Sequence, residues 1–145
     1  MYLIAYKDRK RISDRLIQDW TGYIYSHCEL VVNDISYSSS MQDKGVRAKS
    51  INYTSGNWDI FPITFVDSAK VLNYYQKTKG SKYSYSDLVL KQVLNTKFNT
   101  SGARFCSEWC AEALGIPIAS SLNPGELVEL VKYIESLTNV HTSTN

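Results

Sequence analysis

Cys106 has a sequence setting that suits a nucleophile. It stands in the segment FCSEWCAEALG, directly after the polar, glycine-containing stretch 95–104. This order predicts that Cys106 lies at or near the N-terminus of a helix that Gly115 ends. The partial positive charge at a helix N-terminus lowers the pKa of a thiol, and the backbone N–H groups there can stabilise a tetrahedral oxyanion. The position therefore favours a reactive thiolate.

An imidazole and a carboxylate are predicted on one face of an early strand. The segment SHCELVV has the composition of a strand, and side chains two residues apart on a strand share a face. His27 and Glu29 should therefore point one way, and Cys28 and Leu30 the other. A protonated histidine beside Cys106 would lower the pKa of the thiol further, and His27 is a candidate for that role.

The other cysteines have simpler structural interpretations. A cysteine in an apolar helix is often a core residue, and this applies to Cys106 as well. Cys110 competes with Cys106 as a nucleophile, but it lies one turn further into the helix, where the dipole effect has faded. Cys28 is expected to pack in the core. A zinc site at Cys106 and Cys110 lacks the paired C-x-x-C spacing of structural zinc sites, so no metal or cofactor is predicted.

Several polar residues have weaker functional interpretations. The run Ser38 to Ser40 has no second histidine nearby to act as a base. Glu108 is best explained as a first-turn acidic residue that complements the helix dipole. Arg47 would suit a substrate carboxylate, but an exposed strand arginine is the favoured interpretation.

The elements around these residues predict an α+β fold. A first helix is expected from the spacing of Ile12, Leu16, Ile17 and Trp20, with Ser13 or Asp14 as its cap. Two strands should meet at a tight turn at Asn33 and Asp34. Two further strands are expected in GVRAKSI and WDIFPITF, and Pro62 suggests that the second lies at a sheet edge or is interrupted.

The second half of the chain is predicted to be mainly helical. A helix capped by Asp67 or Ser68 should end at Gly80, with Val71, Leu72 and Tyr75 facing inward, and a short one should follow Ser86 through Leu88, Leu90 and Leu94. The last helix should start at Asn123, with Pro124 at its first position and Glu126 completing a capping box. The tail 138–145 is expected to be flexible.

Length and composition limit the classes of protein. The 145 residues and 43% hydrophobic content fit one domain spanning residues 1–145. Lys and Arg number 16 against 14 Asp and Glu, and apart from the short run Lys7, Arg9, Lys10 and Arg11 the basic residues are scattered, so no nucleic-acid partner is predicted. The N-terminus does not fit a secretory signal peptide, no stretch is long enough to span a membrane, and the three cysteines suit a reducing compartment. A cytoplasmic location is therefore expected.

Several segments together resemble a known family. They are SHCELV, SSS followed by DKGVR and a tryptophan-containing strand, KYSY, FCSEWCAEALG, and Asn-Pro before the last helix. Over about residues 20–135 the chain is similar to the permuted NlpC-like branch of the papain-like fold. This branch includes YiiX-like and lecithin retinol acyltransferase-like proteins, and small proteins of tailed phages and bacteria related to cell-wall hydrolases. In it the histidine strand precedes the cysteine helix.

The resemblance implies a cysteine hydrolase with an antiparallel sheet or partial barrel packed against helices. It makes Cys106 the nucleophile, His27 the base and Glu29 the candidate for the polar third residue, although Ser38 to Ser40 and Asp43 on the next strand are alternatives. The expected reaction is amide cleavage through an acyl-enzyme, on a peptide, a peptidoglycan peptide or a protein. Two alternatives stay open: a catalytically silent binding or inhibitor protein on the same fold, and a thioesterase or acyltransferase.

Overall fold

The computed structural model describes residues 1–82, 105–117 and 122–142. Within these residues the chain forms five strands and four helices, which confirms the predicted α+β class. The strands are β1 (Tyr2–Tyr6), β2 (His27–Val32), β3 (Ile35–Ser40), β4 (Gly45–Lys49) and β5 (Trp58–Pro62). The helices are α1 (Ile12–Thr21), α2 (Ser68–Thr78), α4 (Cys106–Leu114) and α5 (Pro124–Thr142). The helix predicted after Ser86 and the loop 95–104 lie outside the described residues.

The five strands make one antiparallel sheet in the order β4-β3-β2-β1-β5. Asn33 and Asp34 have φ values of 49° and 61° and join β2 to β3 in the predicted tight turn, because a two-residue hairpin turn of this kind requires positive φ at both positions. β5 lies at one edge of the sheet, as Pro62 predicted, since proline cannot donate a hydrogen bond to a further strand.

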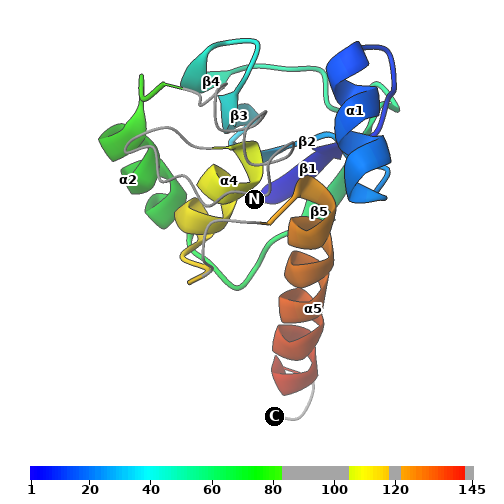
Figure 1. Ribbon diagram of the computed structural model, residues 1–145. Helices are drawn as coiled ribbons and strands as arrows, with labels where there is room; N and C mark the ends of the chain where they lie inside the picture. Colours follow the sequence, from blue (N-terminus) through cyan, green and yellow to red (C-terminus); the bar gives the residue numbers. More distant parts are fainter. Residues whose placement is uncertain (83–104, 118–121, 143–145) are drawn as a thin grey trace.

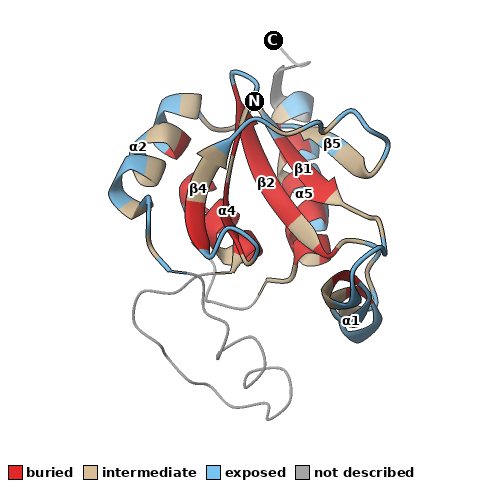
Figure 2. Cartoon of the chain, turned by 90° about the horizontal axis from the view of Figure 1, so that it is seen from above, coloured by how far each residue is buried: buried red, intermediate tan, exposed pale blue. Residues whose placement is uncertain are grey.

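Helices α4 and α5 cover one face of the sheet (Figures 1 and 2). α4 packs on β2 and β3, α5 packs on β1 and β5, and α2 lies beside α4. The core between the layers takes alternate residues of the strands, including the fully buried Leu3, Cys28 and Leu30. Trp109 of α4 is also fully buried, and its indole N–H donates to Thr78 Oγ1 at 2.9 Å. Cys28 and Leu30 of β2 thus both face the core, which confirms the alternation predicted for this strand.

The helix boundaries agree with the local signals at most ends. The Asp67 carboxylate caps α2 by accepting from the Ala69 N–H at 2.8 Å. Asn123 and Glu126 form the predicted capping box of α5, with reciprocal side-chain to backbone bonds of 2.9 and 2.8 Å. α5 continues to Thr142, beyond the start of the tail predicted from residue 138. Adding residues to a helix that has already formed is much easier than starting a new one. The flexibility of the tail stays a prediction.

Helix α1 forms where predicted, but its cap differs from expectation and its apolar residues face outward. Its N-cap residue is Arg11, and Asp14 is the third helical residue, whose carboxylate accepts from the Arg11 N–H at 3.2 Å. The apolar residues Ile12, Leu16 and Trp20 face solvent, whereas Asp14 is buried. The prediction of Ser13 or Asp14 as the cap was therefore wrong, since helical spacing alone does not locate the first turn.

Candidate active site

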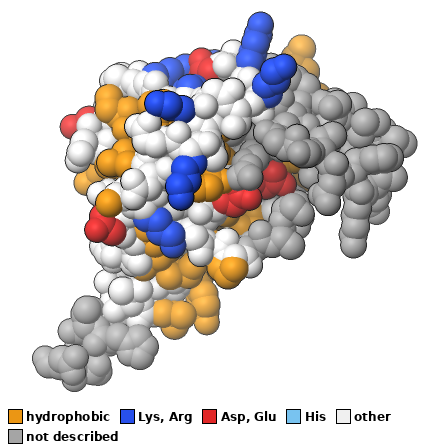
Figure 3. All heavy atoms as spheres, turned by 90° about the vertical axis from the view of Figure 1, so that its left-hand side faces the viewer, with side chains coloured by type: hydrophobic (Ala, Val, Ile, Leu, Met, Phe, Trp, Pro, Cys, Tyr) orange, Lys and Arg blue, Asp and Glu red, His pale blue; other side chains and the backbone are white. Residues whose placement is uncertain are grey.

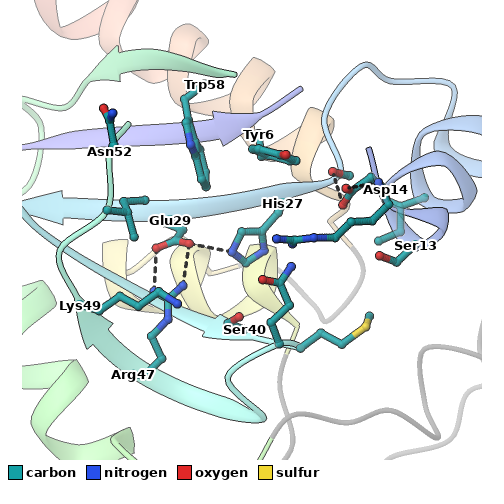
Figure 4. Close-up of a pocket in the computed structure, with 16 residues that line it drawn as sticks. Tyr6, Ser13, Asp14, His27, Glu29, Ser40, Arg47, Lys49, Asn52 and Trp58 are labelled. Atoms are coloured by element: carbon teal, nitrogen blue, oxygen red, sulfur yellow. Dashed lines mark hydrogen bonds and ion pairs between the residues drawn. The ribbon is translucent and has the colours of Figure 1, made fainter. Parts of the chain in front are cut away.

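His27 and Glu29 lie on the face of β2 that points away from α4 and α5, as their spacing predicted. His27 is the first residue of β2 and pairs with Tyr6 of β1. Its Nε2 lies 3.0 Å from Glu29 Oε1 (Figure 4). Because Glu29 holds Nε2, the other ring nitrogen, Nδ1, is the one left to face a different partner.

Glu29 is buried in a network of charged and polar partners. Its side chain is 3% exposed, and both carboxylate oxygens accept from the guanidinium of Arg47, each at 2.7 Å. The hydroxyl of Ser36 also donates to Glu29. Burial alone would raise the pKa of Glu29, but the hydrogen bonds from Arg47 and His27 hold it far below its usual value. Glu29 is therefore a carboxylate that fixes the ring of His27.

Arg47 has a role that the sequence interpretation missed. Its side chain is only 15% exposed, so the interpretation as an exposed strand arginine was wrong. Its Nε donates to Asp43 at 2.6 Å, and Asp43 also binds Lys49 at 2.8 Å. Burial favours a higher pKa at Asp43, but Lys49 and Arg47 lower that pKa to about 2. Asp43 thus orients the guanidinium that holds Glu29.

Cys106 occupies the first position of α4 and is 5% exposed. The N-cap residue is Phe105, whose N–H donates to Glu108 at 3.3 Å, so Glu108 completes the helix start as its position suggested. The first N–H groups of a helix have no acceptor within the helix. A thiolate or an oxyanion next to Cys106 therefore lies in the field of these donors.

β2 and β3 separate at the end of the sheet that carries His27. Their paired register covers only Leu30 to Val32 of β2. Beyond it, the carbonyl of Cys28 accepts from Ser38 Oγ at 2.8 Å instead of from the backbone of β3, and the Cys110 thiol lies 3.8 Å from the same carbonyl. The thiol of Cys106 interacts with Cys28 and with the imidazole of His27.

The charges of this pair follow from its contacts. A hydrogen bond from the Cys28 thiol and the adjacent His27 lower the pKa of Cys106 well below its ordinary value, against the opposing effect of burial. Burial alone lowers the pKa of His27, but Cys106 and then Glu29 outweigh it and raise the pKa to about 10. Burial and the neighbouring thiols raise the pKa of Cys28. These directions favour a thiolate at Cys106 beside an imidazolium at His27, with Cys28 neutral.

A pocket of about 320 Å³ opens on the other side of His27. Trp58 and Tyr6 form an aromatic wall, with ring centroids 5.0 Å apart, and Trp58 also lies 6.3 Å from the ring of His27 (Figure 4). Polar side chains from α1, from β4 and from the loops next to them complete the lining: Arg11, Ser13, Asp14, Gln42, Arg47, Lys49 and Asn52. Cys106 belongs to the core, so its thiol approaches the imidazole of His27 from the core side. The pocket opens on the opposite, solvent-facing side of the same imidazole.

The structure thus brings together Cys106, His27 and Glu29, and their catalytic roles stay predictions. Asp43 contacts Arg47 and not His27, and Ser38 binds the backbone of Cys28. Among the alternative third residues, Ser38 and Asp43 therefore have these other partners. The residues that sequence reasoning missed are Ser36, Arg47 and the aromatic wall, whose partners depend on strand order.

Among residues 1–82, 105–117 and 122–142, no group of three histidine, cysteine or acidic side chains is placed to hold a metal ion. None of the helices in the same ranges is long and apolar enough to cross a membrane. No family model matches the chain, and no curated protein is significantly similar to it.

Proposed function

We propose that this protein is a cysteine hydrolase that cleaves amide bonds, with Cys106 as nucleophile and His27 as its acid and base. The observation that carries the proposal is the thiol of lowered pKa at a helix N-terminus, next to an imidazole whose other nitrogen is held by a buried carboxylate. A nucleophile, its base and an orienting group in one chain of contacts are the parts of a covalent acyl-transfer site.

The proposed reaction begins from the ion pair. The Cys106 thiolate attacks the carbonyl carbon, and the N–H groups at the start of α4 stabilise the oxyanion. The imidazolium of His27 gives its proton to the leaving nitrogen, and the C–N bond breaks to leave an acyl-enzyme. His27 then takes a proton from water, the hydroxide attacks the thioester, and the acid is released with Cys106 again a thiolate.

The fold proposed for this site is the permuted papain-like one. Support comes from the chain order, in which the histidine strand β2 precedes the cysteine helix α4, and from the packing of α4 on an antiparallel sheet. The substrate class that this resemblance suggests is a peptide, including the peptide stems of peptidoglycan. The aromatic wall of Trp58 and Tyr6 beside His27 supports a substrate with an apolar or ring-shaped group near the scissile bond.

The test is cleavage of a panel of peptides, peptidoglycan fragments and activated esters, followed by mass spectrometry. Cys106→Ala should abolish cleavage and His27→Ala should lower kcat by about 10² to 10⁴-fold, as for loss of a general acid and base. Cys110→Ala is the matched control, since it removes a buried thiol from the same helix and should retain activity. Cleavage that survives Cys106→Ala, or no cleavage of any substrate, would contradict the proposal.

One observation favours a second candidate, a binding protein without activity. Cys106 is 5% exposed and is not among the residues that line the pocket beside His27. In a binding protein the pocket beside His27 would hold a ligand without a reaction at sulfur. Ligand binding that is unchanged in Cys106→Ala, together with a thiol that is inert in the folded protein, would support this candidate over the hydrolase.

A further inference from the structure

Helix α1 carries its apolar side chains on the outside of the molecule. Ile12, Leu16 and Trp20 are 77%, 65% and 59% exposed, and their spacing of four residues places them on one helix face. Ile24, just after the helix, is 60% exposed. Ile12, Leu16, Trp20 and Ile24 are called the α1 apolar face below. Apolar side chains gathered on one exposed face usually mark an interaction site.

The orientation of α1 is fixed by polar contacts on its inner face. Asp14 accepts from the hydroxyl of Ser26 at 3.1 Å, and Gln18 Nε2 donates to the carbonyls of Lys7 and Ile24 at 3.1 and 2.5 Å. Asp14 and Gln18 are 5% and 3% exposed. Turning the apolar face inward would break these buried hydrogen bonds, which is costly. The exposed apolar face is therefore a built feature of the fold.

The same segment carries an excess of positive charge. Between Lys7 and Trp20 the sequence has five basic and three acidic residues, so this segment alone accounts for the net charge of +2 of the whole chain. Asp14 is buried, Asp19 pairs with Arg9, Asp8 pairs with Lys10, and Lys7 pairs with Asp59 of β5, which leaves Arg11 and Arg15 as the exposed basic residues outside these pairs. Basic side chains also lie on the side of the molecule that carries α2 (Figure 3).

We propose that the α1 apolar face docks on an anionic lipid surface. A helix with apolar side chains along one side and basic residues at its rim lies in the headgroup region of such a surface, where tryptophan is also favoured. The charge excess selects the lipid surface over a neutral apolar partner, because each basic residue near anionic headgroups adds attraction. The inference does not depend on the chemistry of Cys106.

Docking through this face would bring the pocket close to the lipid headgroups. Ser13 and Ile17 of α1 line the pocket beside His27, while the apolar face lies on another side of the same helix. A substrate held at a lipid surface would then have a short path to the pocket. The C-terminal end of α5 lies far from α1 (Figure 1).

The test is co-sedimentation of the full chain with vesicles of phosphatidylcholine alone or mixed equally with phosphatidylglycerol. We expect binding to the mixed vesicles, a blue shift of tryptophan emission that Trp20→Phe removes, and loss of binding at high salt. Leu16→Ser with Trp20→Ser should lower the partition coefficient at least tenfold. Lys10→Gln with Arg15→Gln should lower it by about fivefold for each charge removed.

The matched control is Tyr133→Ser with Leu137→Ser, which removes two exposed apolar residues with the same spacing from α5. This control should bind vesicles as the wild type does, and the thermal unfolding of all variants should stay close to that of the wild type. Absence of wild-type binding, equal loss in the control, or concentration-dependent self-association that the α1 variant abolishes would overturn the proposal. The last result would assign the face to a second copy of the chain.

Discussion

Replacing Arg47 with methionine should destabilise the protein more than any other single change at the site. The side chains of Arg47 and Glu29 are 15% and 3% exposed and share two hydrogen bonds of 2.7 Å. Removal of one partner leaves a buried carboxylate with half of its donors gone, which costs about 3 to 5 kcal/mol. For a chain of this size the Tm should fall by roughly 10 °C.

The Arg47–Glu29 pair also affects how the stability of the protein depends on pH. The pKa of Glu29 is depressed in the folded protein, so its contribution to stability is present above the ordinary carboxyl pKa and is lost as the pH falls through the depressed value. In Arg47→Met the pKa of Glu29 should rise toward its ordinary value. The loss of stability in acid that Glu29 causes should then be smaller than in the wild type and should be complete at a higher pH.

Urea denaturation of four proteins measures the interaction. Glu29→Gln, Arg47→Met and the double variant, compared with the wild type, should give a coupling free energy of about 2 kcal/mol. Lys49→Met is the matched control, because its side chain is 44% exposed in its ion pair with Asp43 and should cost less than about 1 kcal/mol. A cost for Arg47→Met no larger than that of Lys49→Met, or additive effects with Glu29→Gln, would refute this reasoning.

Three smaller changes probe the surroundings of the site. Cys28→Ala should raise the pKa of Cys106, because it removes the thiol that donates to it, and absorbance at 240 nm against pH would detect this. An unchanged titration would show that Cys28 does not affect Cys106. Ser36→Ala should cost about 1.5 to 3 kcal/mol in urea denaturation, as for a lost hydrogen bond to the charged Glu29, and a cost near zero would contradict the contact. Asn123→Ala should lower stability by about 1 kcal/mol through loss of the α5 cap, whereas Asn123→Asp should retain it.

Features that depend on a few neighbouring residues were predictable from the sequence. The turn at Asn33 and Asp34 and the capping box at Asn123 are set by local backbone geometry, so their residue types identify them. Alternation along β2 likewise places His27 and Glu29 on one face. The position of Cys106 at the start of α4 follows from the same kind of local signal.

Features that depend on strand order or on which side is buried could not be predicted in this way. Arg47 reaches Glu29 across β3, and only the sheet order brings β4 that close to β2. Periodicity identified α1 as a helix but did not show that Asp14 and Gln18, rather than its apolar residues, face inward. The short register between β2 and β3 near His27 likewise depends on the whole sheet.

The central claim is that Cys106 and His27 form a thiolate and imidazolium pair. Alkylation by iodoacetamide across pH, with mass spectrometry locating the label, measures this in the wild type, Cys106→Ser and His27→Ala. We predict that Cys106 reacts with an apparent pKa well below the usual value of about 8.5, and that this pKa rises in His27→Ala. If all three cysteines react alike, or if Cys106 is inert in the folded protein at every pH, the account is contradicted.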